Sequence, residues 1–214
     1  MDKDVPMDIY GPYRPALEAV MKKAEDDMES VFRTAGKETG TMPYEHLRCR
    51  LKSDESMRAK LRKKGLPETA ASALTGVRDA VGIRIVCRFI DDIYDNIRRI
   101  RALPGYEVVR EKDYIKNVKP NGYRSYHLIV EAEAPFTDAL GRCPGRFYME
   151  IQLRTLAMDS WASLEHEMKY KHAIQDSGLI ESELKRCADE LASCDMSMQT
   201  IRNLIRAGGK ERCS

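Results

Sequence analysis

With 214 residues, 43% of them hydrophobic and 33% charged, the chain is long enough for one compact domain, and we expect a single domain over residues 1–214. No apolar run reaches the ~18 residues that a membrane span requires, and the amino-terminal sequence MDKDVPMDIY lacks the apolar stretch of a signal peptide. These features argue against a membrane-bound or secreted protein, and we expect a cytoplasmic one.

The first half of the chain is predicted to contain two helices, a strand and a third helix. Apolar residues at helical spacing predict a helix over residues 13–33. The segment TAGKETGT interrupts this pattern, and a short helix is predicted to begin at Ser53, whose side chain can cap the free amides. The sequence VGIRIVC at 81–87 predicts a strand, and isoleucines at helical spacing predict a helix over 91–103.

Three further strands are predicted over residues 106–114, 125–133 and 146–153. The Asn121-Gly122 pair is a strong tight-turn signal, so the first two of these strands are predicted to form a hairpin. The third strand alternates between apolar and polar residues, which predicts one wall in the core and one polar wall. The residues of that polar wall are Tyr148, Glu150, Gln152 and Arg154.

Two helices are predicted to follow the strands. The first covers residues 156–172, with one apolar stripe formed by Ala157, Trp161, Leu164 and Met168. The second covers residues 181–206. Its 3,4-spaced seam consists of Leu184, Cys187, Leu191, Cys194, Met198, Ile201 and Ile205. Such a seam requires another helix, either the one over 13–33 or one from another subunit. The predicted fold class is α+β, with a mixed, mostly antiparallel sheet flanked by helices.

The six cysteines form no CxxC pair and have no metal-ligand spacing with the four histidines. This pattern suggests neither a zinc site nor a disulfide framework. We expect reduced thiols.

Positive charge is concentrated in two stretches, although the net charge is only +2. Residues 48–64 carry eight Lys/Arg against two acids, and residues 108–127 carry five against two. Such local positive fields favour a polyanionic ligand, and phosphates are the obvious candidates. Because the chain contains neither GxxxxGK[ST] nor GxGxxG, side chains must hold any phosphate.

The candidate phosphate and metal ligands come from three predicted elements. Arg50, Lys52 and Lys60 could bind phosphate, although a solvated basic face would give the same pattern. Asp79 stands at the mouth of the strand over 81–87, and Glu150 stands on the polar wall of its own strand. Magnesium takes one or two protein carboxylates and leaves its other positions to phosphate and water. Together with the basic residues, these two acids predict a Mg²⁺ site.

Aromatic and stacking groups suggest a nucleotide pocket. Arg84 must emerge on the polar face of its strand, where it could stack on a base or pair with an acid. Tyr123, Ser125 and His127 share one face, close to Lys119. They could bind a base, or the tyrosines could simply pack across strands.

Three stretches resemble the RelA/SpoT synthetase domain: GVRDAVGIRIVCRFIDD, DYIKNVKPNGYRSYHLIVE and YMEIQLRTLAMDSWASLEHEMKYK. The resemblance covers about residues 45–172, and the whole chain is similar to small alarmone synthetases of the RelQ type. It implies a nucleotidyltransferase-like fold and a Mg²⁺-dependent GTP pyrophosphokinase of the stringent response. The implied reaction transfers the β,γ-pyrophosphate of ATP to the ribose 3′-hydroxyl of GDP or GTP, with GMP as a further candidate acceptor, and yields ppGpp or pppGpp.

The resemblance also implies a role for each matching residue. Asp79 would bind Mg²⁺, and Glu150 would bind Mg²⁺ or receive the proton of the 3′-hydroxyl. On the ATP side, Arg50 and Arg84 would sandwich adenine, while Lys52 and Lys60 would neutralise phosphates. The expected guanine-nucleotide residues are Lys112, Lys119, Asn121, Tyr123 and His127, with Tyr123 stacking on guanine.

Two other functions share parts of this pattern. One is a toxin-like relative that pyrophosphorylates the 3′ end of tRNA, and the other is a single-stranded RNA-binding module that uses the basic and aromatic residues. Relatives of this type often form tetramers through their terminal helices. The helices over 13–33 and 181–206 are therefore expected to serve packing or assembly into a homotetramer.

Overall fold

The computed structural model describes residues 8–171 and 177–211. Its strands are β1 (His46–Leu51), β2 (Val81–Cys87), β3 (Tyr106–Asp113), β4 (Tyr126–Ala134) and β5 (Gly145–Thr155). They form a five-stranded sheet in the order β1-β2-β5-β4-β3. The β2–β5 pair is parallel and the other three pairs are antiparallel. The predicted α+β class with a mixed, mostly antiparallel sheet is confirmed.

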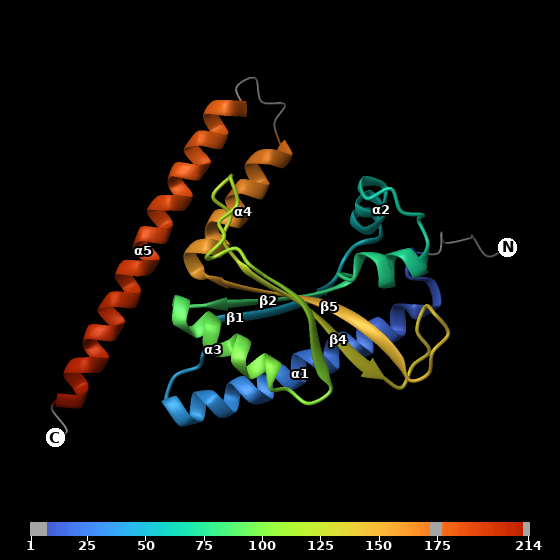
Figure 1. Ribbon diagram of the computed structural model, residues 1–214, viewed down its shortest axis with the longest axis horizontal. Helices are drawn as coiled ribbons and strands as arrows, with labels where there is room; N and C mark the ends of the chain where they lie inside the picture. Colours follow the sequence, from blue (N-terminus) through green and yellow to red (C-terminus); the bar gives the residue numbers. More distant parts are fainter. Residues whose placement is uncertain (1–7, 172–176, 212–214) are drawn as a thin grey trace.

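The helices are distributed over both faces of this sheet. They are α1 (Arg14–Thr39), α2 (Asp54–Lys63), α3 (Ile90–Arg101), α4 (Leu156–Lys171) and α5 (Ser177–Glu211), with a 3₁₀ turn at Gly11–Tyr13 and a π-helical turn at Ser72–Val77. Figure 1 shows α1 and α3 against one face, and α2 and α4 at opposite ends of the other. The long helix α5 runs beside α4 and α3. None of the helices in the described ranges is both long enough and apolar enough to cross a membrane.

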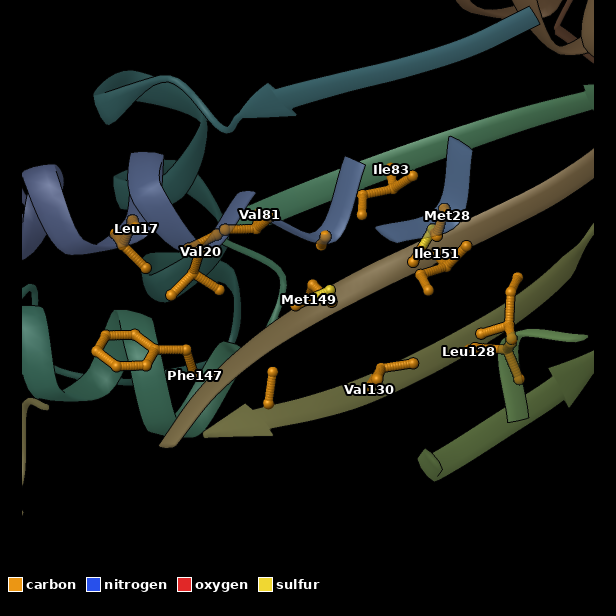
Figure 2. Close-up of a cluster of buried hydrophobic side chains, with 14 of the residues drawn as sticks. Leu17, Val20, Met28, Val81, Ile83, Leu128, Val130, Phe147, Met149 and Ile151 are labelled. Carbon is orange, nitrogen blue, oxygen red and sulfur yellow. The ribbon is translucent and has the colours of Figure 1, made fainter. Parts of the chain in front are cut away.

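The main core lies between α1 and the sheet. Pro15 stands in the first turn of α1, where its missing N–H costs nothing, and Gly40 ends the helix at a φ of 72°. Figure 2 shows Leu17, Val20 and Met28 of this helix close to apolar side chains of β2, β4 and β5. Each such fully buried side chain contributes about 1.5–3 kcal/mol to stability. One face of the sheet is therefore committed to packing.

The opposite face carries mostly polar side chains, in two rows that are in register across all five strands. One row runs through Arg50, Gly82, Glu150, Ile129 and Arg110. The next row runs through Arg48, Arg84, Gln152, His127 and Lys112. Because side chains alternate along a strand, these rows point away from the core. The register thus brings the candidate residues of distant segments to one surface.

Strand β1 was not predicted from the sequence. Its sequence HLRCRL alternates between exposed and half-buried positions, and it forms an edge of the sheet beside β2. Strand prediction depends on apolar runs, and three of these residues are histidine or arginine. The cap at Ser53, by contrast, is confirmed, because its hydroxyl accepts a hydrogen bond from the Ser56 amide at 3.3 Å.

Strands β3 and β4 are consecutive and pair antiparallel, so the predicted hairpin is confirmed. The connection runs through residues 114–125, and the Asn121-Gly122 turn lies at its far end. The Gly122 amide donates to the Lys119 carbonyl at 2.8 Å, which closes that turn. Below we call residues 114–125 the acceptor loop.

The apolar stripe predicted for the helix over 156–172 is largely wrong. Trp161 is buried, and its indole donates to the Leu184 carbonyl of α5 at 2.8 Å, but Leu164 and Met168 are exposed. The predicted end of this helix at His172 lies outside the described residues.

Only part of the seam predicted for α5 is buried. Leu184 is buried with Ala188 against Trp161, whereas Cys187, Cys194, Met198, Ile201 and Ile205 are exposed. In the described chain α5 packs on α4 and α3, so the helix over 13–33 is not the partner that buries this seam. Packing against another subunit remains a prediction. The five cysteines of the described ranges are free thiols, as expected.

Candidate functional site

Two adjacent cavities open on the polar face of the sheet, and Asp79 and Glu150 line both of them. The first cavity, of about 360 Å³, is bounded by β1, β2 and β5. Its walls include Arg48, Arg50, Lys52, Asp79, Arg84, Glu150 and Gln152. The second cavity, of about 660 Å³, reaches across to β3 and the acceptor loop. Its walls include Lys60, Lys64, Arg78, Asp79, Arg110, Lys112, Tyr114, Lys119, His127 and Glu150.

The first cavity has arginines from two neighbouring strands. Arg50 of β1 pairs with Gly82, two residues before Arg84 on β2, so both guanidinium groups project from the same face. Arg84 is held by an ion pair with Asp159 of α4 at 3.3 Å. Burial, and then the charge of Arg154, lower the pKa of Arg84. Planar guanidinium groups in such a cavity can stack on an aromatic base.

Asp79 sits where the two cavities meet, and it is almost fully buried. The preceding residue, Arg78, has a φ of 61°, an uncommon left-handed conformation that turns the chain into β2. Lys52 and Lys60 both donate to Asp79 Oδ2, whereas Oδ1 has no hydrogen-bond partner among the described residues. A buried carboxylate oxygen without a partner is costly, which is typical of a site that binds a ligand.

The two lysines reach Asp79 from different elements. Lys52 follows β1 directly, and Lys60 lies on α2, whose start is fixed by the Ser53 cap. Burial lowers the pKa of Lys52, although the neighbouring charge of Asp79 acts in the opposite direction. Two ammonium groups converging on one carboxylate oxygen create a strongly positive point beside the acid.

Glu150 is held by two side chains on the same face. His127 Nδ1 lies 3.1 Å from Glu150 Oε1, and the Gln152 amide donates to Oε2 at 2.7 Å. Burial alone would raise the pKa of Glu150, but the hydrogen bonds from His127 and Gln152 and the charge of Lys60 outweigh it and lower the pKa. A carboxylate that is this acidic is a better metal ligand than a proton acceptor at neutral pH.

The second cavity is dominated by cations from α2, β3 and the acceptor loop. Lys112 lies on β3 beside His127, and Lys119 Nζ lies 4.5 Å from the centroid of the Tyr114 ring. The walls contain six Lys or Arg residues against three carboxylates, Asp79, Glu111 and Glu150. A cavity with this excess of ammonium and guanidinium groups and an aromatic ring suits a polyphosphate with an attached ring system.

Among the residues predicted from the sequence, Asn121 and Tyr123 do not line either cavity. Asn121 accepts a hydrogen bond from the Tyr123 amide at 3.2 Å and donates to Glu165 at 3.2 Å, so it stabilises the acceptor loop. The Tyr123 ring lies beside the cavity wall, with Lys119 Nζ 4.4 Å from its centroid. All the other predicted site residues line one or both of the two cavities.

Several wall residues were not identified from the sequence. Arg48 was hidden because β1 was not predicted, and Arg110 because the register shift between Val108 and Arg110 changes which residues face the cavity. Gln152, which lines the first cavity, and Arg154, which lines neither cavity, were assigned to the polar wall of β5 but given no role. They stand two and four residues after Glu150 on the same side of the strand, and this spacing was the signal that could have identified them.

The acids fit a magnesium ion, on the basis of the donor set. Among the described residues no group of three or more His, Cys, Asp or Glu side chains could form an all-protein metal site. Magnesium does not need one, because it binds through one or two carboxylates and keeps water and phosphate oxygens. Asp79 Oδ1, buried and without a hydrogen-bond partner in the described part of the chain, is the free ligand atom that such a site requires.

Comparisons with known proteins agree with this geometry. Residues 49–175 match the family model described as "Region found in RelA / SpoT proteins". The chain is 37% identical over 190 residues to the GTP pyrophosphokinase YwaC of Bacillus subtilis, an alignment that covers 87% of this chain and 89% of that protein.

Solved structures show the same similarity at the level of the fold. The small alarmone synthetase 1 of Bacillus subtilis bound to its product pppGpp matches with a TM-score of 0.75 and 32% identity, covering 91% of this chain and 94% of the other. The same synthetase bound to AMPCPP matches with a TM-score of 0.67 and 29% identity, covering 92% and 94% of the two chains.

Proposed function

The chain belongs to the RelA/SpoT family, and from this premise we propose that it is a GTP pyrophosphokinase that synthesises (p)ppGpp. It transfers the β,γ-pyrophosphate of ATP to the ribose 3′-hydroxyl of GDP or GTP, with GMP as a third acceptor to be tested. The relatives named for this activity or for bound pppGpp and AMPCPP support the proposal. The product is the alarmone of the stringent response.

The observation that carries this proposal is the pair of cavities that share Asp79 and Glu150. A transfer between two nucleotides needs two binding sites that meet at the reacting atoms. The first cavity, with its arginines and Lys52, suits the donor, and the second, with its lysines and Tyr114, suits the acceptor. The shared acids mark the point of transfer.

On the donor side, Arg50 and Arg84 sandwich adenine, and Lys52 and Lys60 neutralise the ATP phosphates. The convergence of both ammonium groups on Asp79 supports this assignment, because a phosphate that reaches Asp79 meets both cations at once. Phosphoryl-type transfer depends on positioning and charge neutralisation more than on covalent catalysis. These four side chains supply both.

Asp79 and Glu150 are the residues that hold Mg²⁺ in this proposal. When bound, the ion neutralises charge on the transferred pyrophosphate and orients it. The free Oδ1 of Asp79 and the low pKa of Glu150 support the role of ligands for both acids. Proton acceptance from the 3′-hydroxyl by Glu150 requires nucleotide binding to change its surroundings.

On the acceptor side, Lys112, Lys119 and His127 contact the phosphates and sugar of the guanine nucleotide. Tyr123 stacks on guanine, and Asn121 stabilises the conformation of the acceptor loop that this stacking requires. Lys119 lies over the Tyr123 ring, so stacking on that face requires the ammonium group to move towards the incoming phosphates. A single movement then opens the aromatic face and adds a cation.

The test is an assay with ATP, Mg²⁺ and each acceptor in turn. We expect guanosine 3′-pyrophosphate products, with kcat lower by roughly 10²–10³-fold in Asp79→Asn and Glu150→Gln. Glu133→Gln is the matched control, because Glu133 is exposed on β4 and lines neither cavity. Label that appears in tRNA but not in free nucleotides would favour the tRNA-directed reaction instead. RNA binding that nucleotides do not compete with would indicate a separate surface.

We also propose that the chain works in the cytoplasm as a homotetramer built on one synthetase domain. The exposed apolar part of α5 supports assembly, since Met198, Ile201 and Ile205 are each more than half exposed. Exposed apolar residues grouped on one helix face are typical of an interface.

A further inference from the structure

Five side chains in and beside the cavity walls form a closed ring of hydrogen bonds. Arg154 Nη2 donates to the Tyr123 hydroxyl at 2.8 Å and to Gln152 Oε1 at 3.1 Å. The Tyr123 hydroxyl lies 2.8 Å from His127 Nε2, and His127 Nδ1 lies 3.1 Å from Glu150 Oε1. Gln152 Nε2 closes the ring on Glu150 Oε2 at 2.7 Å.

The ring has a defined direction, because arginine can only donate and a carboxylate can only accept. The Tyr123 hydroxyl accepts from Arg154, which leaves its own proton free to donate to His127 Nε2. In that arrangement the neutral His127 carries its proton on Nδ1 and donates it to Glu150. Both branches thus run from Arg154 to the carboxylate, and each fixes one of its oxygen atoms.

Arg154 is the anchor of this ring. It is 5% exposed, and beyond the ring it donates to Asp159 at 3.1 Å and to Ser125 at 3.4 Å. Asp159 also pairs with Arg84, so the anchor reaches the wall of the first cavity. Burying an arginine is costly, and an apolar residue would serve stability as well or better. The charge at this position is therefore better explained by what it orients.

We propose that Arg154, Gln152 and the Tyr123 hydroxyl are positioning residues, which hold Glu150 in one orientation and His127 in one tautomer. This inference rests on the proposed function for its catalytic consequence. Each Glu150 oxygen uses one lone pair to accept a hydrogen bond within the ring of hydrogen bonds, and its other lone pair remains available to a ligand in the cavities. Tyr123 consequently has two separable parts, an aromatic ring that can contact a base and a hydroxyl that orients the Glu150 carboxylate.

Tyr123→Phe separates these two parts, because it keeps the aromatic face and removes the hydroxyl. If the ring of hydrogen bonds positions Glu150, kcat falls by roughly 10–100-fold while the KM for ATP stays unchanged. If Tyr123 only stacks on a base, the variant behaves like the wild type. Tyr106→Phe is the matched control, because its hydroxyl donates to Asp27 at 2.6 Å on the core side of the sheet.

Gln152→Met breaks the other branch of the ring with a side chain of similar length. We expect a loss of kcat of similar size. Since either change releases the same carboxylate, the loss in the double variant should be smaller than the product of the two single losses. Losses that multiply would overturn the idea of one ring acting as a unit.

The tautomer of His127 gives a readout that does not depend on activity. In ¹⁵N NMR spectra of the nucleotide-free protein, we expect the wild type to show a protonated Nδ1 and an unprotonated Nε2 for this residue, assigned with His127→Gln. Tyr123→Phe should give a mixture of tautomers, and Tyr106→Phe should not.

The two readouts separate the hypotheses. An unchanged spectrum in Tyr123→Phe, or an altered spectrum with unchanged kcat, would overturn the positioning role. A wild-type chain that transfers no pyrophosphate to any acceptor would overturn the proposed function, and the spectrum would still show whether the ring fixes His127.

Discussion

Asp79 and Asp138 are both almost fully buried, yet their oxygen atoms have opposite environments. Asp138 accepts hydrogen bonds on both oxygens, from the amides of Leu140, Arg142 and Arg146 and from the Arg142 guanidinium. Asp79 leaves Oδ1 without a partner in the described chain. The first pattern stabilises a loop, and the second retains binding capacity for a ligand.

Asp138→Asn should therefore affect stability and leave the reaction intact. Burial alone would raise the pKa of Asp138, but the amide donors and Arg142 outweigh it and lower the pKa to about 2. The asparagine amide faces donors that it cannot satisfy, so we expect a loss of about 1–3 kcal/mol in the free energy of unfolding at pH 7. Urea unfolding measures this loss, with Asp95→Asn as the control, because Asp95 is a partly exposed residue that pairs with Arg98 on the helix surface.

The pH dependence of this loss has a definite sign. The pKa is depressed on folding, so the stabilisation is complete above the unfolded value near 4 and disappears as the pH falls towards 2. The difference between wild type and Asp138→Asn should be constant from pH 7 to pH 5 and shrink between pH 4 and pH 3. An equal difference at pH 3 and pH 7 would contradict this assignment.

At the scale of elements, the acceptor loop is clamped by α5. Arg124 donates to the Ala188 carbonyl at 3.1 Å and to Asp189 at 3.0 Å. Gly122, with a φ of 89°, lies so close to α5 that an added Cβ would be 2.6 Å from Ala188 Cβ. The loop that carries Lys119 and Tyr123 is thus held in place by a helix that lies outside both cavities.

Gly122→Ala should displace this loop and weaken acceptor binding. The left-handed backbone alone costs an alanine about 1–3 kcal/mol, and the contact with Ala188 adds to this cost. We expect the KM for GDP to rise roughly tenfold, a loss of about 1.4 kcal/mol in binding, while the KM for ATP stays unchanged.

Gly141→Ala is the matched control for this prediction. Gly141 also has a positive φ, of 78°, but, its chain neighbours apart, no heavy atom of the described residues lies within 4 Å of its added Cβ. It carries the backbone strain without the contact. Ala188→Gly should partly restore acceptor binding in Gly122→Ala, and the absence of any rescue would argue against the clamp.

At the scale of the whole molecule, the sheet divides the chain into a packing side and a reaction side. The face towards α1 buries the core, and the other face carries the two cavities. Helix α5 lies beside both layers and keeps part of its apolar surface exposed (Figure 1). That surface is where we propose that the chain assembles.

Ile201→Glu and Ile205→Glu should weaken the proposed tetramer. Two carboxylates cannot be buried at an apolar interface without large cost, so we expect a smaller species in light scattering with unchanged helical content. Thr200→Glu is the control, because Thr200 is exposed on a different side of α5. Wild type and variants of equal mass would contradict assembly through this stripe.

The sequence was sufficient for features that depend on neighbouring residues. The alternation from Phe147 to Arg154 located the polar wall of β5, and Ser53 located the start of α2. Motif resemblance identified Asp79 and Glu150, which share both cavities. Periodicity and caps are local properties, because they reflect which side chains point the same way along one element.

Only the tertiary structure decided which distant residues meet. It paired Arg48 with Arg84 across an unpredicted edge strand, brought Lys52 and Lys60 to one oxygen of Asp79, and closed the ring from Arg154 to Glu150. It also placed α5 on α4 and α3 instead of on α1. These contacts depend on strand register and on long-range packing, and a one-residue shift in register would turn the same side chains to the opposite face.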